Sequence, residues 1–189
     1  MSRIPRGFAT LLKRRLQVMA LACLSIGVFA PPPLAAAAES DRLDEAHVKA
    51  AFLYNFAKFV QWPPSDDRPT TLIIGVVGGD RFDDVLESIV SGKNVNGRDI
   101  VVRQMHDEDD ARAFHIVFIA ASEARRTSDI IQRVHRAGVL TVGETPQFLQ
   151  EGGLIQFYIR DNHVRFQINA AAASQAGLKI SSQLLSLSK

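Results

Sequence analysis

The sequence predicts an α/β fold in a single domain, built on a mixed, largely parallel β-sheet with a late antiparallel hairpin and with helices covering the sheet. Short β-branched runs alternate with amphipathic segments along most of the chain, which implies right-handed strand–helix–strand crossovers. Two runs near the C-terminus, 154–160 and 163–169, alternate as hairpin strands do. The chain has 189 residues, of which 47% are hydrophobic, and this is enough for one core.

The first 38 residues have the organisation of a secretory signal peptide. Five basic residues and no acidic residue precede an apolar run, and small residues follow it up to Ala38. The apolar run is shorter than the roughly 20 residues that span a membrane. We therefore expect residues 1–38 to be a cleaved signal peptide and residues 39–189 to form a periplasmic domain. An uncleaved membrane anchor is the alternative.

Removal of such a leader changes the charge of the protein. The whole chain has a net charge of +2, but 17 basic and 20 acidic residues remain after position 38, which gives −3. We therefore expect no binding of nucleic acid and no direct membrane insertion after cleavage. Cys23 is the only cysteine, so the mature chain would have no disulfide, no thiol switch and no thiolate metal site.

Residues 43–62 are predicted to form an amphipathic helix. Val48, Phe52 and Phe59 recur on one face at helical spacing, and Pro63 and the proline after it end the helix.

Strands and helices alternate after this first helix. Strands are predicted where β-branched apolar residues cluster, and helices where a polar cap precedes an apolar period. Asp80 and Ser122 are the expected N-caps of two helices. In chain order, the expected elements are a strand at 71–77, a helix at 81–90, strands at 100–102 and 115–120, a helix at 123–136, a strand at 139–142, a short helix opened by Thr145-Pro146, the hairpin at 154–169 turned by Asp161-Asn162, a helix at 170–176 and an apolar segment at 178–187.

The sequence contains no pattern that indicates catalysis. It has no Gly-x-Ser-x-Gly elbow, phosphate-binding loop or His-Glu-x-x-His pair, and its five histidines are scattered, so we expect no enzyme, cofactor or metal. The acidic run 107–110 lacks the glycine of calcium loops and predicts a solvated helix start. The turn at 78–80 lies where α/β proteins hold anions, but Asp80 would repel a phosphate, and an ordinary turn is the alternative.

Tyr54, Lys58, Gln61 and Trp62 lie away from the apolar face of the first helix or at its margin. Tyrosine and tryptophan supply much of the binding energy at protein interfaces, so these four residues are candidates for partner binding. The alternative for Trp62 is a place in the core.

Asn55 lies at the border of the same apolar face, and a buried amide there must be hydrogen-bonded. It either ties the helix to a neighbouring element or contacts a ligand or partner. Asn55, Arg165 and Asn169 are therefore candidates for structural or ligand contacts.

Several separated segments resemble the YfiR family, in the same order and over nearly the whole mature chain. They are VKAAFLYNFAKFVQWP (48–63), HIVFIAASE (115–123), VLTVGE (139–144), GGLIQF (152–157), VRFQIN (164–169) and AGLKISSQLL (176–185). The resemblance implies a periplasmic α/β homodimer without catalytic residues. It also implies that the protein represses an inner-membrane diguanylate cyclase by binding its periplasmic sensor region, which lowers cyclic-di-GMP and biofilm formation. Better-known members use cysteines for redox control, and this mature chain has none.

Two hypotheses of different classes follow. In the first, the protein is a regulator, and a surface that includes the first helix docks on a membrane partner. In the second, it is a small-solute binding domain with a cleft near the strand ends, where Asn55, Arg165 or Asn169 would supply polar contacts.

Overall fold

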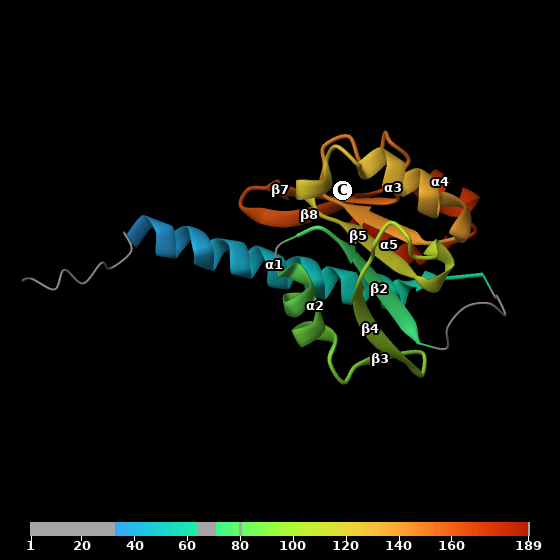
Figure 1. The fold of residues 1–189 in the computed structure, drawn as a ribbon, viewed down its shortest axis with the longest axis horizontal. Helices are drawn as coiled ribbons and strands as arrows, with labels where there is room; N and C mark the ends of the chain where they lie inside the picture. Colours follow the sequence, from blue (N-terminus) through green and yellow to red (C-terminus); the bar gives the residue numbers. More distant parts are fainter. Residues whose placement is uncertain (1–32, 64–70, 80, 189) are drawn as a thin grey trace, which may run out of the picture. The chain divides into compact units, whose positions relative to one another are not determined.

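A seven-stranded sheet is the centre of the structure (Figure 1). Its strands, in spatial order, are β3 (Asn94–Val95), β4 (Arg98–Gln104), β2 (Leu72–Val77), β5 (Ile116–Ile119), β6 (Leu140–Gly143), β7 (Ile155–Arg160) and β8 (His163–Ile168). The strands from β4 to β7 run parallel, while β3 and β8 are antiparallel edge strands. The predicted mixed, largely parallel sheet with a late hairpin is confirmed.

The computed structural model describes residues 33–63, 71–79 and 81–188, so most of the predicted signal peptide lies outside the described residues. Residues 38–189 form one compact unit. Its remaining elements are α1 (Pro33–Phe59), β1 (Val60–Gln61), α2 (Phe82–Val90), α3 (Thr127–Val134), α4 (Ala170–Gln175), β9 (Lys179–Ile180) and α5 (Ser182–Leu187), with short 3-10 turns η1 (Ala111–Ala113), η2 (Ala121–Glu123) and η3 (His135–Ala137).

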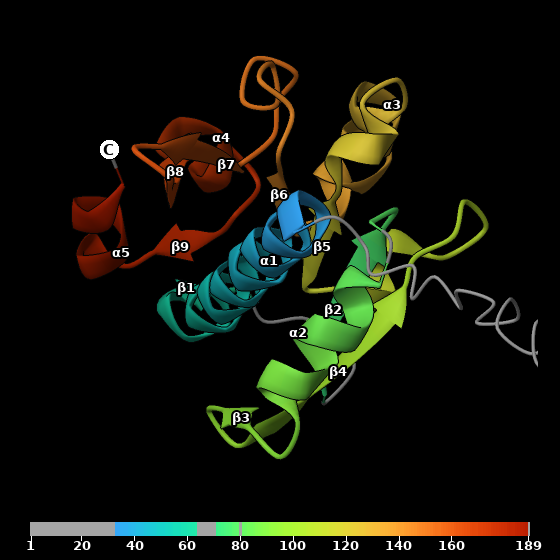
Figure 2. The same ribbon diagram turned by 90° about the vertical axis from the view of Figure 1, so that its left-hand side faces the viewer.

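Helices cover both faces of the sheet. Alternate side chains of a strand point to opposite faces, so a central strand contributes to a core on each side. On β2, Leu72 and Ile74 belong to the core under α1 and α2, while Ile73 and Val77 belong to the core under α3. Figure 2 shows α1 lying along the sheet with α2 beside it. This explains why every residue of β2 is buried.

Phenylalanine rings join α1 to the C-terminal hairpin. Phe52 and Phe56 of α1 contact Phe157 and Phe166, with ring centroids between 5.1 and 6.0 Å apart. Each fully buried ring stabilises the fold by about 1.5–3 kcal/mol. Phe52 of the predicted apolar face therefore packs on β7 and β8, whereas Val48 of the same face is 44% exposed.

The turn between β7 and β8 is formed by Asp161 and Asn162, with φ angles of 50° and 58°. Both residues adopt the left-handed conformation that two-residue hairpin turns require. The predicted hairpin and its turn are confirmed.

Several predicted boundaries are wrong because tertiary contacts override local signals. The first helix ends at Phe59 and not at Trp62, since Val60 and Gln61 pair with β9. The N-cap of α2 is Arg81, in a left-handed conformation with φ 61°, and Asp80 lies outside the described residues. Ser122 does not cap α3, which begins at Thr127.

The loop between β6 and β7 holds turns in place of the predicted short helix. Phe148 in this loop is fully buried, and its carbonyl oxygen accepts a hydrogen bond from Gly153 N at 2.8 Å. A Cβ atom on Gly143 or Gly153 would lie 2.1 or 2.2 Å from the ring of Phe148. The buried ring thus fixes the loop against the backbone at two glycines.

Candidate functional site

The predicted partner-binding residues divide into two groups in the structure. Tyr54 and Lys58 lie together on α1, and Lys93, from the turn before β3, lies beside them. The Nζ atoms of Lys58 and Lys93 lie 5.4 and 4.8 Å from the Tyr54 ring centroid. This is the geometry of cation–π contacts, and it places two exposed positive charges beside one half-buried aromatic ring.

Trp62 lies beyond the helix and packs at the amino ends of the strands. Its indole Nε1–H donates to His115 O at 3.0 Å, and its ring meets the His115 ring edge-on at 5.6 Å. The guanidinium of Arg98 lies 6.0 Å from the Trp62 ring centroid. Gln61 is exposed and belongs to β1. The structure therefore separates Trp62 and Gln61 from the Tyr54–Lys58 pair.

The three candidates for structural or ligand contacts lie apart from one another. Asn55 is half-buried on α1. Asn169 is the N-cap of α4, and its Oδ1 accepts from Ala172 N at 3.0 Å. Arg165 is exposed on β8 and lines a groove.

This groove separates the N-terminal part of α1 from the β7–β8 hairpin and has a volume of about 380 Å³. Val48 is 44% exposed and Ile159 is 51% exposed, and they face a groove whose walls also include Phe52 and Val164. Acidic residues line the helix side, while His163 and Arg165 line the hairpin side. We call it the α1–hairpin groove. It is lined by Asp41, Asp44, Glu45, Val48, Phe52, Ile159, Asn162, His163, Val164 and Arg165.

A second concave region follows the carboxyl ends of the parallel strands. The chain leaves β2 through α2 to β4 on one side, and then crosses to β5 on the other side of β2. The ends of β2 and β5 are therefore a topological switch point, where open α/β sheets commonly bind ligands. Three cavities of about 300, 580 and 280 Å³ follow one another there: the 580 Å³ cavity shares Gly79 with the 300 Å³ cavity, and Gly78, Gln104 and Glu123 with the 280 Å³ cavity. We call this region the carboxyl-edge crevice.

A half-buried lysine joins α1 to this crevice. Lys49 Nζ contacts carboxylate oxygens of Glu45 and Glu144, and the Lys49 side chain is only 12% exposed. Glu144 directly follows β6, and its Oε2 accepts from Ala121 N at 2.9 Å. Burial alone would lower the pKa of Lys49, but the charges and hydrogen bonds of Glu144 and Glu45 raise it above its ordinary value. We call this group the Glu45–Lys49–Glu144 clamp.

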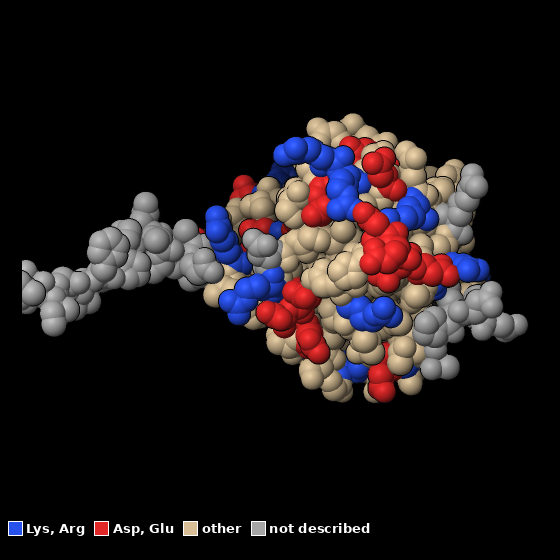
Figure 3. Space-filling model, viewed as in Figure 1, with Lys and Arg blue, Asp and Glu red and all other residues tan. Residues whose placement is uncertain are grey.

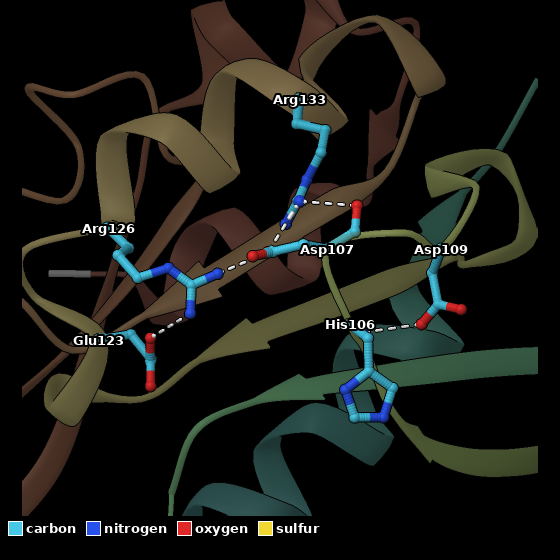
Figure 4. Close-up of polar contacts among 6 residues, drawn as sticks. All are labelled: His106, Asp107, Asp109, Glu123, Arg126 and Arg133. Atoms are coloured by element: carbon cyan, nitrogen blue, oxygen red, sulfur yellow. Dashed lines mark hydrogen bonds and ion pairs between the residues drawn. The ribbon is translucent and has the colours of Figure 1, made fainter.

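A more exposed ion-pair cluster stands at the other end of the crevice (Figure 4). Arg126 Nη2 and Arg133 Nη1 lie 2.5 and 2.9 Å from the same oxygen, Oδ1 of Asp107. The hydrogen bond from Arg133 chiefly holds the pKa of Asp107 below its ordinary value, against desolvation and aided by the charges of Arg126 and Arg133. Figure 4 shows the imidazole of His106 directed away from these ion pairs. The cluster therefore ties the loop after β4 to α3.

The rest of the acidic run also makes local contacts. Asp110 caps η1, because its side chain accepts from Arg112 N at 2.9 Å, and the predicted helix start is confirmed there. Figure 3 shows acidic side chains gathered over this loop with basic side chains beside them. At the neighbouring turn, Gly79 N donates to Ser122 Oγ at 3.3 Å, so one donor that an anion would need already has a partner.

Within the described ranges, no three His, Cys, Asp or Glu side chains are grouped so that they could hold a metal ion. The helices of the same ranges include none with the length and apolar content of a membrane span.

Comparison with known proteins identifies the family. Residues 46–189 match the family described as YfiR/HmsC-like. The chain belongs to the YfiR/HmsC-like family. This is a family of periplasmic regulatory proteins, so the resemblance seen in the sequence is confirmed.

Comparison with solved structures gives a distant likeness for this YfiR/HmsC-like chain. A conserved domain protein from Vibrio cholerae O1 biovar eltor is 14% identical, with a TM-score of 0.49. The match covers 62% of this chain and 53% of that protein, so the chain spans about half the length of its structural relative. No curated protein matches the chain.

Sequence reasoning missed the clamp, Lys93 and the groove. Lys49 and Glu144 are 95 positions apart, and no local pattern links them. One signal was available, since Lys49 directly precedes the buried Ala50 on an amphipathic helix, and a charge at the edge of a buried face needs a partner.

Proposed function

We propose that this protein is a non-enzymatic periplasmic regulator that binds the periplasmic sensor region of a membrane diguanylate cyclase and so lowers cyclic-di-GMP. The α1–hairpin groove is the partner site in this proposal. The observation that carries it is the exposure of Val48 and Ile159 in a groove of a family whose members are regulatory. Contiguous apolar surface on a monomeric protein commonly marks a binding site, and the apolar side chains of Val48, Phe52, Ile159 and Val164 line this one groove.

The groove has the composition of an interface. Its apolar floor is bordered by acidic side chains from α1 and by His163 and Arg165 from the hairpin. Interfaces commonly combine an apolar centre with a polar rim, and the rim charges fix orientation and speed association. Tyr54, Lys58 and Lys93 offer a second, basic contact for an acidic part of the same partner.

A matched pair of valine substitutions tests the proposal. Val48→Lys places a charge in the groove, whereas Val101→Lys places it on β4 at a valine that is 39% exposed. We expect Val48→Lys to weaken binding to the cyclase sensor region by about thirtyfold, or roughly 2 kcal/mol, and Val101→Lys to leave it unchanged.

The cellular test is deletion of the gene. Cyclic-di-GMP should rise, and wild-type protein, but not Val48→Lys, should restore the lower level. Unchanged cyclic-di-GMP, together with no capture of a cyclase by the purified protein, would refute the regulatory assignment.

Export and assembly belong to the same proposal. The leader is cleaved after Ala38, and the mature domain acts in the periplasm as a homodimer, as its family membership supports. N-terminal sequencing of periplasmic protein should find Glu39 first. Light scattering should give twice the mass of one mature chain, and a monomer at micromolar concentration would contradict the dimer.

Binding of a small solute is the second candidate function, and the carboxyl-edge crevice favours it. The crevice lies at the switch point of a parallel sheet. The residues predicted to supply polar contacts in such a site lie elsewhere. Arg165 lines the α1–hairpin groove, and Asn169 Oδ1 accepts the capping hydrogen bond of α4. A screen of periplasmic metabolites by thermal shift tests this function, and ligand-induced protection of Glu144 from exchange would locate the site.

A further inference from the structure

The clamp lies between the two concave regions of the molecule. Glu45 lines both the 300 Å³ cavity of the crevice and the α1–hairpin groove, while Lys49 and Glu144 line the crevice. The Glu45 side chain therefore borders both the crevice and the groove.

The N-terminal part of α1 has few other attachments. Asp41, Arg42, Leu43 and Asp44 are exposed, Ala46 is half-buried, and fully buried positions begin only at Ala50. The same stretch supplies the helix wall of the groove. Phe52 fixes the far end of this wall to the hairpin, and the ion pair of Lys49 with Glu144 links the part before Ala50 to the ends of β5 and β6.

The two arms of the clamp differ in strength. Glu144 is 17% exposed and also accepts from Ala121 N, so it is fixed to the ends of β5 and β6. Glu45 is 38% exposed and belongs to the same helix as Lys49, so its pair with Lys49 does not anchor the helix to the sheet. The Lys49–Glu144 arm is the one that holds α1 against the sheet.

We propose that the Glu45–Lys49–Glu144 clamp is a coupling device, which sets the position of the helix wall of the groove and transmits changes in the crevice to partner binding. With the clamp closed, the wall stands at one distance from the hairpin, and the groove is ready for its partner. When the Lys49–Glu144 arm opens, the wall leaves the sheet and partner affinity falls. The partner part of this inference rests on the proposed function, whereas the position of the wall does not.

Distances across the groove test the proposal without any partner. With Cys23 replaced by serine, cysteines introduced as Asp44→Cys and His163→Cys place one spin label on each wall of the groove. The labelled protein should give one narrow distance distribution. Lys49→Met and Glu144→Gln should each broaden it by roughly twofold, because a helix end with few buried contacts detaches locally.

Two controls make the comparison specific. Lys49→Arg keeps the charge and should give the same narrow distance distribution as the wild-type protein. Arg112→Met removes an exposed ion pair with Asp110 elsewhere on the surface and should change nothing. Circular dichroism identifies any variant that fails to fold. Glu144→Gln is nearly isosteric, so it keeps the test valid if Lys49→Met unfolds.

The partner arm uses the purified periplasmic sensor region of a cyclase. Its affinity should fall about tenfold in both clamp variants, which corresponds to about 1.4 kcal/mol, and should stay unchanged in Arg112→Met. An unchanged distance distribution in Glu144→Gln would overturn the proposal, and so would a broadened distribution with unchanged affinity. If the wild-type protein binds no cyclase region, the proposed function fails, and the distances alone decide the position of the wall.

Discussion

Replacing Trp62 with alanine should lower stability, because the structure places the ring against the sheet. The alanine variant lacks the hydrogen bond from the indole to His115 O, the edge contact with the His115 ring and the contact with Arg98. Removal of a fully buried tryptophan costs about 3–5 kcal/mol, and Trp62 is only partly buried, so we expect a loss of about 3 kcal/mol. The Tm should then fall by roughly 6–12 °C.

A graded series separates the ring from its hydrogen bond. Trp62→Phe keeps an aromatic ring and removes the N–H donor, so it should lower the unfolding free energy by about 1 kcal/mol. His115 O keeps its bond from Leu140 N at 2.9 Å, so no buried acceptor is left without a partner. Gln61→Ala, at the exposed neighbour, should stay within about 0.5 kcal/mol.

Urea unfolding of the purified variants measures these differences, and binding to a cyclase sensor region is measured in parallel. A Trp62→Ala protein of unchanged stability that no longer binds the partner would refute the packing argument. Trp62 would then be the interface anchor that the sequence also allowed.

Three further predictions follow from other contacts. Gly143→Ala should lower the unfolding free energy by about 1–3 kcal/mol, because the new Cβ would overlap the Phe148 ring, and Phe148→Leu in the same chain should recover part of the loss in urea unfolding. The pKa of Asp107 is lowered in the folded protein, so its stabilising contribution is present at pH values above its unfolded pKa and disappears as the pH falls through its folded pKa. The acid-unfolding curve of Asp107→Asn should therefore lack this loss of stability. Identical curves for the variant and the wild-type protein would contradict the ion pairs. Reductant and thiol reagents should leave partner binding by the mature protein unchanged, since the only cysteine is Cys23, and a change in affinity would show another redox-sensitive group.

The parts of the fold that the sequence predicted correctly depend on local chemistry. Asp161 and Asn162 tolerate left-handed angles, and the alternation around them sets the strand faces, so the hairpin could be located from the sequence alone. The β-branched run around Ile74 likewise identified a strand buried on both faces.

The errors occur where distant segments decide local structure. Phe59 ends α1 because Ser181 N donates to Phe59 O and β9 pairs with the residues after it, and the segment that does this lies about 120 positions further along the chain. Ser122 has the side chain of a helix cap, but its hydroxyl accepts from Gly79 N at the end of another strand. Neither hydrophobic periodicity nor helix propensity can predict such contacts. The candidate site was the least predictable part, because the Lys49–Glu144 ion pair and the groove are formed by residues far apart in the sequence.

Helix α1 explains why a protein without a catalytic pattern has several surfaces of functional interest. Its phenylalanines fix the helix to β7 and β8, while Lys49 fixes it to the ends of β5 and β6. The remaining faces of the helix carry Val48 toward the groove and the exposed Lys58 beside the half-buried Tyr54 ring. A small movement of one helix would therefore change both contact surfaces together. A regulator needs such a shared element, because its output is the affinity for a partner and has to respond to events elsewhere in the domain.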